Sequence, residues 1–150
     1  PIYMSVSGKD TDEFWLKAAD LIYRDYELKD MKSIYIHGDG ANWIKEGIDW
    51  LPESMLVLDK FHLNKAIMEA TARQPEKRRD IYRAINTSDL NFFKKITTEM
   101  AKCASSERER KMITDFSRYI TNNWSSITIR NEEDCGSSSP KGSRKSRTFL

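Results

Sequence analysis

Cysteine is scarce in this sequence, and long hydrophobic runs are missing. The two cysteines, Cys103 and Cys135, lie far apart and match no metal-binding spacing, so we expect a reducing, cytoplasmic location. No apolar run approaches the roughly 20 residues of a membrane helix. No signal peptide is recognisable, and we expect no membrane partner.

The chain also lacks a strong excess of charge. Its formal net charge is +2, so overall charge does not predict a nucleic-acid partner. The basic residues are unevenly placed, because residues 136–150 contain four of them and no acid. We predict Trp124–Arg130 as extended and 131–150 as a disordered basic tail, so that 124–150 forms a separate C-terminal segment.

The sequence does contain a strand–helix–strand pattern. Two apolar runs, Ser33–His37 and Ser54–Leu58, flank a helical pattern over Asn42–Trp50. This order is typical of parallel strands joined by a right-handed crossover, which indicates the α/β class. Two parallel strands are not stable alone, so we expect further strands upstream of Pro1. An initiator methionine is also missing, and we expect a piece of a longer protein.

The rest of the chain has helical spacing. A helix is predicted over Asp12–Tyr26, before the first strand. Four more follow the second strand, at Phe61–Arg73, Glu76–Asn86, Leu90–Lys102 and Glu107–Thr121. We therefore predict three parts: a partial α/β core over 1–59, a helical region over 60–123 and the C-terminal segment over 124–150.

An aspartate follows each predicted strand. Asp39 stands within Gly-Asp-Gly after the first strand, and Asp59 follows the second. The carboxyl ends of parallel neighbours, about 4.8 Å apart, open onto one edge of a sheet, where sites gather. His62 lies in the first turn of the helix predicted after Asp59. We name Asp39, Asp59 and His62 as candidate catalytic residues, and the two aspartates as candidate metal ligands.

Each candidate also has a structural explanation. Asp39 could simply form a turn, and Asp59 could cap the following helix, which does not exclude a functional role. His62 could pack in the core or bond a carbonyl group. A role as metal ligand or proton shuttle would require Asp59 or a metal ion nearby. His37 lies on the strand itself, where alternation favours packing.

Other aromatic and basic residues are assigned to ordinary roles. Trp43 and Trp50 are expected in packing. Three lysines near the acids could approach phosphates, but a solvated role is favoured for Lys45, Lys60 and Lys65. The stretch Arg73–Arg83 is basic with interspersed acids, and a solvated helix face is favoured there over a nucleic-acid contact.

Carboxylates at strand ends suit two-metal phosphoryl transfer. In that chemistry, acids hold two Mg²⁺ or Mn²⁺ ions about 4 Å apart, which activate the nucleophile and stabilise the leaving oxygen. Two aspartates are fewer than the usual arrangement needs, so a third acid is expected.

Two longer motifs surround the aspartates. They read Ile-Tyr-Ile-His-Gly-Asp-Gly-Ala-Asn-Trp-Ile-Lys over 34–45 and Leu-Asp-Lys-Phe-His-Leu-Asn-Lys over 58–65. With Thr-Asp-Glu-Phe-Trp at 11–15, Asn-Asn-Trp at 122–124 and Glu-Asp-Cys at 133–135, they resemble the ISLre-type insertion-sequence transposases. That bacterial group was long catalogued as an uncharacterised protein family. The resemblance covers roughly residues 1–135.

The group is similar to Mutator-type transposases, whose RNase H-like core carries an Asp-Asp-Glu triad. The resemblance implies a partial RNase H-like core with a helical insertion, metal-dependent cleavage and transfer of DNA strands, and Mg²⁺ or Mn²⁺ as cofactor. The implied partners are transposon-end DNA and, as an open option, a second copy of the chain. On this likeness Asp39 matches the second catalytic acid, and Asp59 with His62 matches a motif at the next strand–helix junction.

Two parts of the family pattern are absent. The first acid should precede Pro1, and the third should follow Cys135 in a segment with a second Cys and a Glu-Gly-His run. The chain reads Gly-Ser-Ser-Ser-Pro over 136–140 instead, and the nearby acids are poor substitutes: Glu132, Glu133 and Asp134. We predict a transposase fragment, truncated at both ends and inactive alone.

Two alternatives stay open. A non-catalytic helical nucleic-acid-binding or interaction module would use Arg73–Arg83 and the basic tail, and its DNA binding would survive Asp39→Asn. A metal-dependent phosphatase would use Asp39 and Asp59, and its turnover would be lost on Asp39→Asn.

Overall fold

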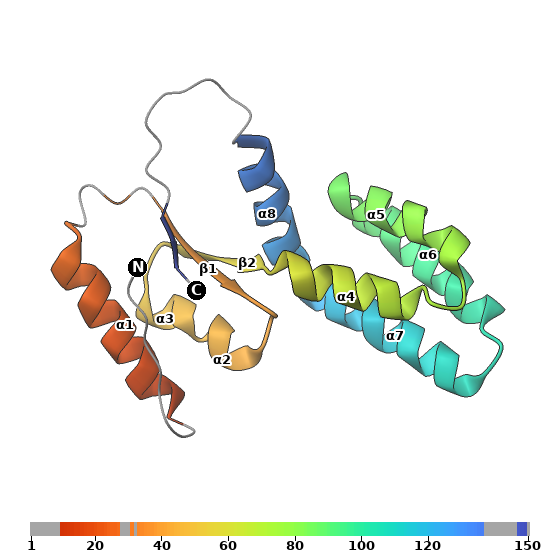
Figure 1. Cartoon of the computed structure of the whole chain (residues 1–150), viewed down its shortest axis with the longest axis horizontal. Helices are drawn as coiled ribbons and strands as arrows, with labels where there is room; N and C mark the ends of the chain where they lie inside the picture. The colour runs from red at the N-terminus through yellow and green to blue at the C-terminus, as the bar shows by residue number, and fades with distance from the viewer. Residues whose placement is uncertain (1–9, 28–30, 32, 137–146, 150) are drawn as a thin grey trace. The chain divides into compact units, whose positions relative to one another are not determined.

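The computed structural model describes residues 10–27, 31, 33–136 and 147–149. The chain divides into two compact units (Figure 1). The first unit holds the described residues up to Leu56 together with 147–149, and the second holds residues 57–136. Each unit has its own cluster of buried hydrophobic side chains.

Helix α1 (Thr11–Asp25) opens the first unit. It begins where the side chain of Asp10 accepts the backbone N–H of Glu13 at 3.0 Å, which satisfies one of the free donors of the first turn. Its buried face consists of Trp15, Ala18, Ala19 and Ile22. The helix predicted over Asp12–Tyr26 is therefore confirmed to within one residue at each end.

The sheet has three strands: β1 (Ile34–Gly38), β2 (Ser54–Leu58) and β3 (Arg147–Phe149), in the order β2-β1-β3. The last two residues of β2 are counted with the second unit. Both strands predicted from apolar runs are confirmed. Strand β3 was not predicted, and it runs parallel to β1 with Ile36 opposite Phe149. Alternate residues of β1, Ile34 and Ile36, are buried in the same cluster as the inner face of α1.

The link between β1 and β2 is two short helices, α2 (Asn42–Lys45) and α3 (Gly47–Trp50). The single helix predicted over Asn42–Trp50 is wrong in this respect. The indole N–H of Trp15 donates to the carbonyl oxygen of Trp43 at 2.7 Å, which competes with the bond that a continuous helix would make there. Glycine at position 47 also weakens helix continuation.

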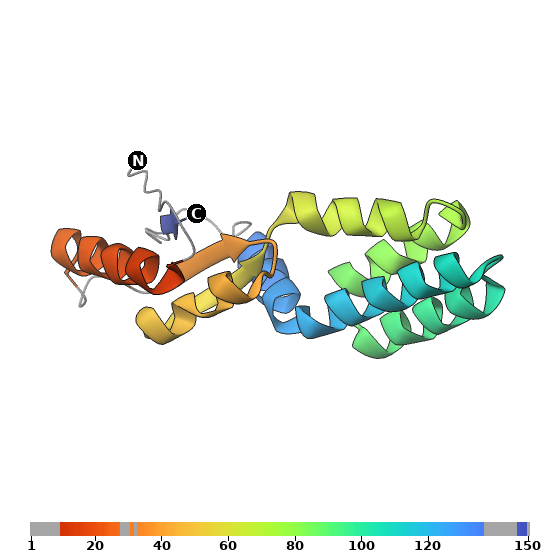
Figure 2. The same cartoon turned by 90° about the horizontal axis from the view of Figure 1, so that it is seen from below.

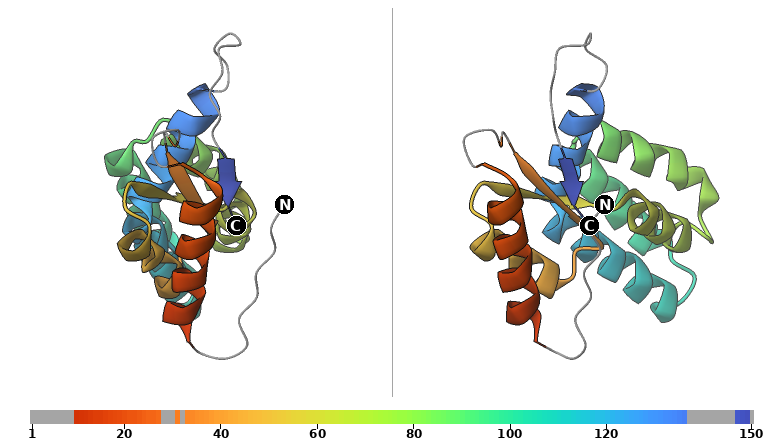
Figure 3. Two further views of the ribbon diagram at one scale, coloured as in Figure 1. Left: turned by 90° about the vertical axis from the view of Figure 1, so that its left-hand side faces the viewer. Right: turned by 60° about the vertical axis from the view of Figure 1, so that its left-hand side comes forward.

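The second unit is helical, with α4 (Lys60–Ala70), η2 (Pro75–Lys77), α5 (Arg78–Asn86), α6 (Leu90–Cys103), α7 (Glu107–Asn122) and α8 (Trp124–Gly136). The four helices predicted for residues 61–121 are confirmed as α4, α5, α6 and α7, with shifts of up to three residues at their ends. Helix α6 packs against α5 and α7, and α4 packs against the same two helices (Figures 2 and 3). A 3₁₀ turn starting at Pro75 precedes the second predicted helix.

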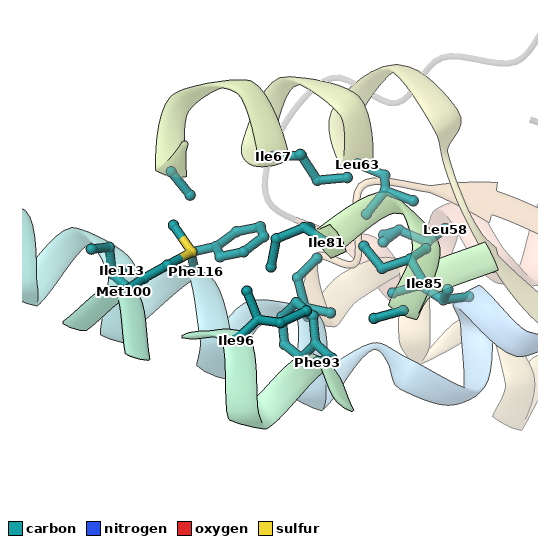
Figure 4. Packing of buried hydrophobic residues seen from close by; sticks show 14 residues of the cluster. Leu58, Leu63, Ile67, Ile81, Ile85, Phe93, Ile96, Met100, Ile113 and Phe116 are labelled. Carbon is teal, nitrogen blue, oxygen red and sulfur yellow. The ribbon is translucent and has the colours of Figure 1, made fainter. Parts of the chain in front are cut away.

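Phe93 belongs to this unit's buried core, which Figure 4 shows. Its ring is fully buried, with a relative exposure of 0%. The ring centroids of Phe116 and Trp124 each lie 5.7 Å from that of Phe93. Such tilted and edge-on pairs are favourable beyond the area they bury, so this aromatic cluster joins α6, α7 and α8.

Helix α8 corrects two predictions. Trp124–Arg130 is helical, not extended, and residues 131–136 continue the helix, where disorder was predicted. Ile127 is fully buried, and the side-chain amide of Asn131 donates to the carbonyl oxygen of Ile85 at 2.7 Å. These contacts outweigh the strand preference of the local Ile and Thr residues. Residues 137–146 of the predicted tail lie outside the described residues, and 147–149 form β3.

A buried polar network ties the loop before α7 to the rest of the unit. The side-chain amide of Gln74 donates to the carboxylate of Glu109 at 3.2 Å and to the carbonyl oxygen of Met100 at 3.1 Å. The backbone N–H of Ser105 donates to the same carboxylate at 2.9 Å. The bond from Ser105, followed by that from Gln74 to the carboxylate, lowers the pKa of Glu109 below its ordinary value.

Candidate functional site

Asp39 lies on an exposed turn directly after β1. Its carboxylate oxygen Oδ1 accepts the backbone N–H of Ala41 at 2.9 Å, which is the turn role that the sequence offered. Gly40 has φ of 87°, a conformation that favours glycine. The turn therefore holds an exposed carboxylate at the carboxyl end of a strand, where ligands bind in open α/β sheets.

Asp59 is the N-cap of α4, at the carboxyl end of β2. Its Oδ1 accepts the backbone N–H groups of Phe61 at 2.8 Å and His62 at 3.1 Å. Partial burial raises the pKa of Asp59, but the hydrogen bonds from His62 and Phe61 outweigh it and lower the pKa below its ordinary 3.8. The cap therefore stabilises the fold fully above that value and is lost as the pH falls further.

The same aspartate contacts the ring of His62. Nδ1 of His62 lies 3.1 Å from Oδ1 of Asp59, and both side chains are about half exposed, at 48% and 41%. With the proton on Nδ1, the ring donates to Asp59 and keeps Nε2 as an acceptor. The ring of Phe61 stands edge-on to His62, with centroids 5.4 Å apart. The geometry is that of an imidazole oriented by a carboxylate, which suits proton transfer.

Replacing Asp59 by alanine should cost about 1 kcal/mol of the free energy of unfolding, because the N-cap is lost. It should also change the ring NMR signals of His62, which is easily followed because the chain has two histidines. Urea unfolding and a ring-nitrogen spectrum would measure the two effects.

Asp89 provides the matched control for Asp59. It caps α6 by accepting the N–H of Phe92 at 2.8 Å. Asp89→Ala should lower the stability by a similar amount and leave the His62 signals unchanged. If the ring signals of His62 are unchanged in Asp59→Ala, the contact between Asp59 and His62 is wrong.

The structure brings together Asp59 and His62 in the second unit, whereas Asp39 belongs to the first. Oδ1 of Asp59 has three N–H contacts, with the backbone of Phe61 and with the backbone and ring of His62. Carboxylate oxygens fit the preference of Mg²⁺, which takes few protein ligands. Within the described ranges, no group of three or more His, Cys, Asp or Glu side chains could hold a metal. Glu132 is exposed on α8, and the side chains of Glu133 and Asp134 lie outside the description.

The basic stretch Arg73–Arg83 has largely structural contacts. Lys77 pairs with Glu99 at 3.2 Å, and Nε of Arg78 donates to the hydroxyl of Thr71 at 2.8 Å. The guanidinium of Arg83 lies 4.7 Å from the ring centroid of Phe92. The exposed lysines of α6, at positions 94, 95 and 102, were not predicted as a charged surface, because they are spread along a helix and do not form a run.

The remaining residues named from the sequence have varied positions. His37 is half-buried on β1, and Lys60 and Lys65 are exposed on α4. Trp50 is half-buried, while Trp43 is 43% exposed although it packs beside Phe14 and Trp15. Trp43 therefore has only part of the packing role that was predicted for it, because its ring contacts two aromatic neighbours but stays 43% exposed.

Comparison with known proteins identifies the family. A family described as "Uncharacterised protein family (UPF0236)" matches residues 3–141. The chain belongs to the UPF0236 family. A UPF0236 protein of Caldanaerobacter subterraneus subsp. tengcongensis with eleven labels, from TTE0033 to TTE2212, is 42% identical over 132 residues, which is 88% of this chain and 28% of the relative.

Two further UPF0236 proteins of that organism show the same relation. TTE1650/TTE2708 is 42% identical, and TTE2489 is 41% identical, each over 88% of this chain. The matches cover 27% and 29% of those relatives, so the UPF0236 chain spans less than a third of their length. No solved structure matches it. In the part of the chain that the structure describes, no helix is long and apolar enough to cross a membrane.

Proposed function

We propose that this UPF0236 chain is a fragment of a DDE-type DNA transposase, with part of an RNase H-like core and a helical insertion. The observation that carries the proposal is the Asp59–His62 pair, 3.1 Å apart, at the junction of β2 and α4. A carboxylate-oriented imidazole at the end of a strand suits the proton transfers of phosphoryl chemistry. Asp39, exposed at the end of β1, supplies a second carboxylate.

The names of the relatives add independent support. One relative has eleven labels and another has two, all in a single organism. If each label is a gene copy, one protein recurs at many places in one genome. Such recurrence is the trace that an insertion sequence leaves when it copies itself.

Each residue has a role in this proposal. Mg²⁺ or Mn²⁺, when bound, would stabilise the charge that develops on the phosphate oxygens. Asp39 in the first unit and Asp59 in the second would each offer a carboxylate oxygen as a metal ligand, and Oδ1 of Asp59 positions His62 for a proton or a phosphate oxygen. The further acids of the site would come from parts of the whole protein that this chain does not contain, so the chain alone is expected to be inactive.

The experiment uses a relative of full length. The 132-residue segment of TTE2489 that matches this chain is replaced by the residues of this chain, and excision of the element from a plasmid carrying its native flanking DNA is measured. We expect the chimera to excise the element, Asp39→Asn to reduce excision by more than about 100-fold, and His62→Ala by about 10- to 100-fold.

Asp49→Asn provides the matched control, because Asp49 is an exposed acid of the same unit that lies on α3. It should leave excision unchanged. Full excision by Asp39→Asn would remove Asp39 from the site. If the chimera fails to assemble, the same substitution at the residue of TTE2489 aligned with Asp39 decides the question. Failure of the unaltered relative to excise the element would overturn the transposase proposal.

A further inference from the structure

Helix α6 divides its residues cleanly between two faces. Its buried face consists of Phe93, Ile96, Thr97 and Met100. The opposite face is exposed and polar, with Asn91, Lys94, Lys95, Thr98 and Lys102. We call these five residues the α6 lysine face. At 1.5 Å per residue, Lys94 and Lys102 are about 12 Å apart along the helix axis.

The positive charge of this face is not neutralised by the helix itself. The one acid within α6 is Glu99, whose carboxylate already pairs with Lys77 at 3.2 Å. The capping residue Asp89 accepts the backbone N–H of Phe92. Among the residues that the structure describes, none of the three lysines forms an ion pair with an acid. The α6 lysine face therefore keeps three positive charges in solvent.

Helix α7 provides a contrast within the same unit. Its exposed cations alternate with acids, since Arg110 pairs with Glu107 at 2.8 Å and Arg118 pairs with Asp115 at 3.1 Å. Such interspersed charge is typical of a solvated helix face. The α6 lysine face differs because none of its cations pairs with an acid: Glu99 lies next to Lys95 and Lys102 on the helix surface, but its carboxylate pairs with Lys77.

We propose that the α6 lysine face binds the phosphate backbone of duplex DNA. A span of about 12 Å covers three to four base steps at about 3.4 Å each, which brings several phosphates within reach of flexible lysines. The side-chain amide of Asn91 supplies a neutral donor of the kind that commonly bonds phosphate oxygens, whereas the hydroxyl of Thr98 donates to the carbonyl oxygen of Lys94 at 2.8 Å. Such contacts position the protein on DNA and do not read its sequence.

This inference deepens the proposed function and rests on it only in the choice of DNA as the partner. The face has no large exposed hydrophobic side chain, which a membrane-binding helix would carry. An acidic protein would also offer negative charge to the lysines. The experiment below distinguishes it from DNA by using polyglutamate as a second probe. Binding to DNA needs no metal, so it is measured with a chelator present and independently of strand cleavage.

The test is fluorescence anisotropy of a labelled 30-base-pair duplex, titrated with the whole chain between 50 and 200 mM salt, in the range where phosphate contacts dominate. The variant is Lys94→Gln with Lys95→Gln and Lys102→Gln. If each lysine contacts one phosphate, the slope of log K against log salt should fall in magnitude by about 2.7. The affinity should fall on the order of 10-fold or more at the lower salt concentration.

The matched control removes three charges from α7, by Arg108→Gln, Lys111→Gln and Arg118→Gln. It should lower the slope by less than about 1. Equal changes in the two variants, absence of DNA binding by the unaltered chain, or stronger binding to polyglutamate than to DNA would overturn the proposal. Asp39→Asn should bind DNA normally, so loss of excision with intact DNA binding would separate the site from this face. Circular dichroism verifies that each variant is folded.

Discussion

Replacing Phe93 by alanine should lower the free energy of unfolding by about 3–5 kcal/mol. The side chain has 0% exposure and contacts the rings of Phe116 and Trp124, at 5.7 Å between centroids. Its loss removes the transfer free energy of a whole ring and leaves a cavity between three helices, which the packed neighbours fill only in part. Urea unfolding followed by circular dichroism measures the change.

The adjacent Phe92 provides the control for this prediction. It is half-buried, and its ring lies against the guanidinium of Arg83 at 4.7 Å. Phe92→Ala removes a smaller buried area and a surface cation–π contact worth about 0.5–1 kcal/mol. The loss should therefore be clearly smaller than for Phe93→Ala. A larger loss for Phe92→Ala would show that the core of the second unit is centred elsewhere.

The helices around Phe93 were predictable because local signals agree with their burial. In α6, Asp89 stands at the N-cap and the apolar residues recur at helical spacing from Leu90 to Met100. The structure ends the helix at Cys103, one residue beyond the prediction. Capping residues and periodicity both lie within a few positions along the chain, so sequence alone locates such a helix well.

The misses come from contacts between distant residues. Ile127 and Thr128 favour a strand locally, but burial of Ile127 and the bond from Asn131 to Ile85 select a helix. Strand β3 has three residues, and its pairing with β1 joins positions more than 100 residues apart. No local pattern contains that information.

The candidate site was predictable for a similar reason, and only in part. A spacing of three puts His62 in the first turn beside its N-cap, so the contact with Asp59 follows from helix geometry. The α6 lysine face was not predictable, because the folded structure decides whether each lysine's positive charge is neutralised by an acid. Lys77 finds Glu99 on another helix, which leaves the lysines of α6 unpaired among the described residues.

Replacing Gly47 by alanine should destabilise the chain by about 1–3 kcal/mol, although alanine ordinarily stabilises a helix by about 1 kcal/mol relative to glycine. A Cβ atom at this position would lie 2.5 Å from two ring carbons of Trp15. The indole cannot simply turn away, because it is buried and its N–H bonds the carbonyl oxygen of Trp43 at 2.7 Å. Overlap with a fixed ring therefore outweighs helix propensity.

The decisive comparison is a double-mutant cycle with Trp15→Leu, measured by urea unfolding. A smaller side chain at position 15 removes the ring carbons that Cβ would meet, so Gly47→Ala should cost much less in that background. The coupling between the two substitutions should reach about 1 kcal/mol or more, as for residues in direct contact. If Gly47→Ala stabilises the unaltered chain, the close approach of Trp15 to α3 is wrong. The break between α2 and α3 would then have to follow from the weak helix propensity of glycine alone.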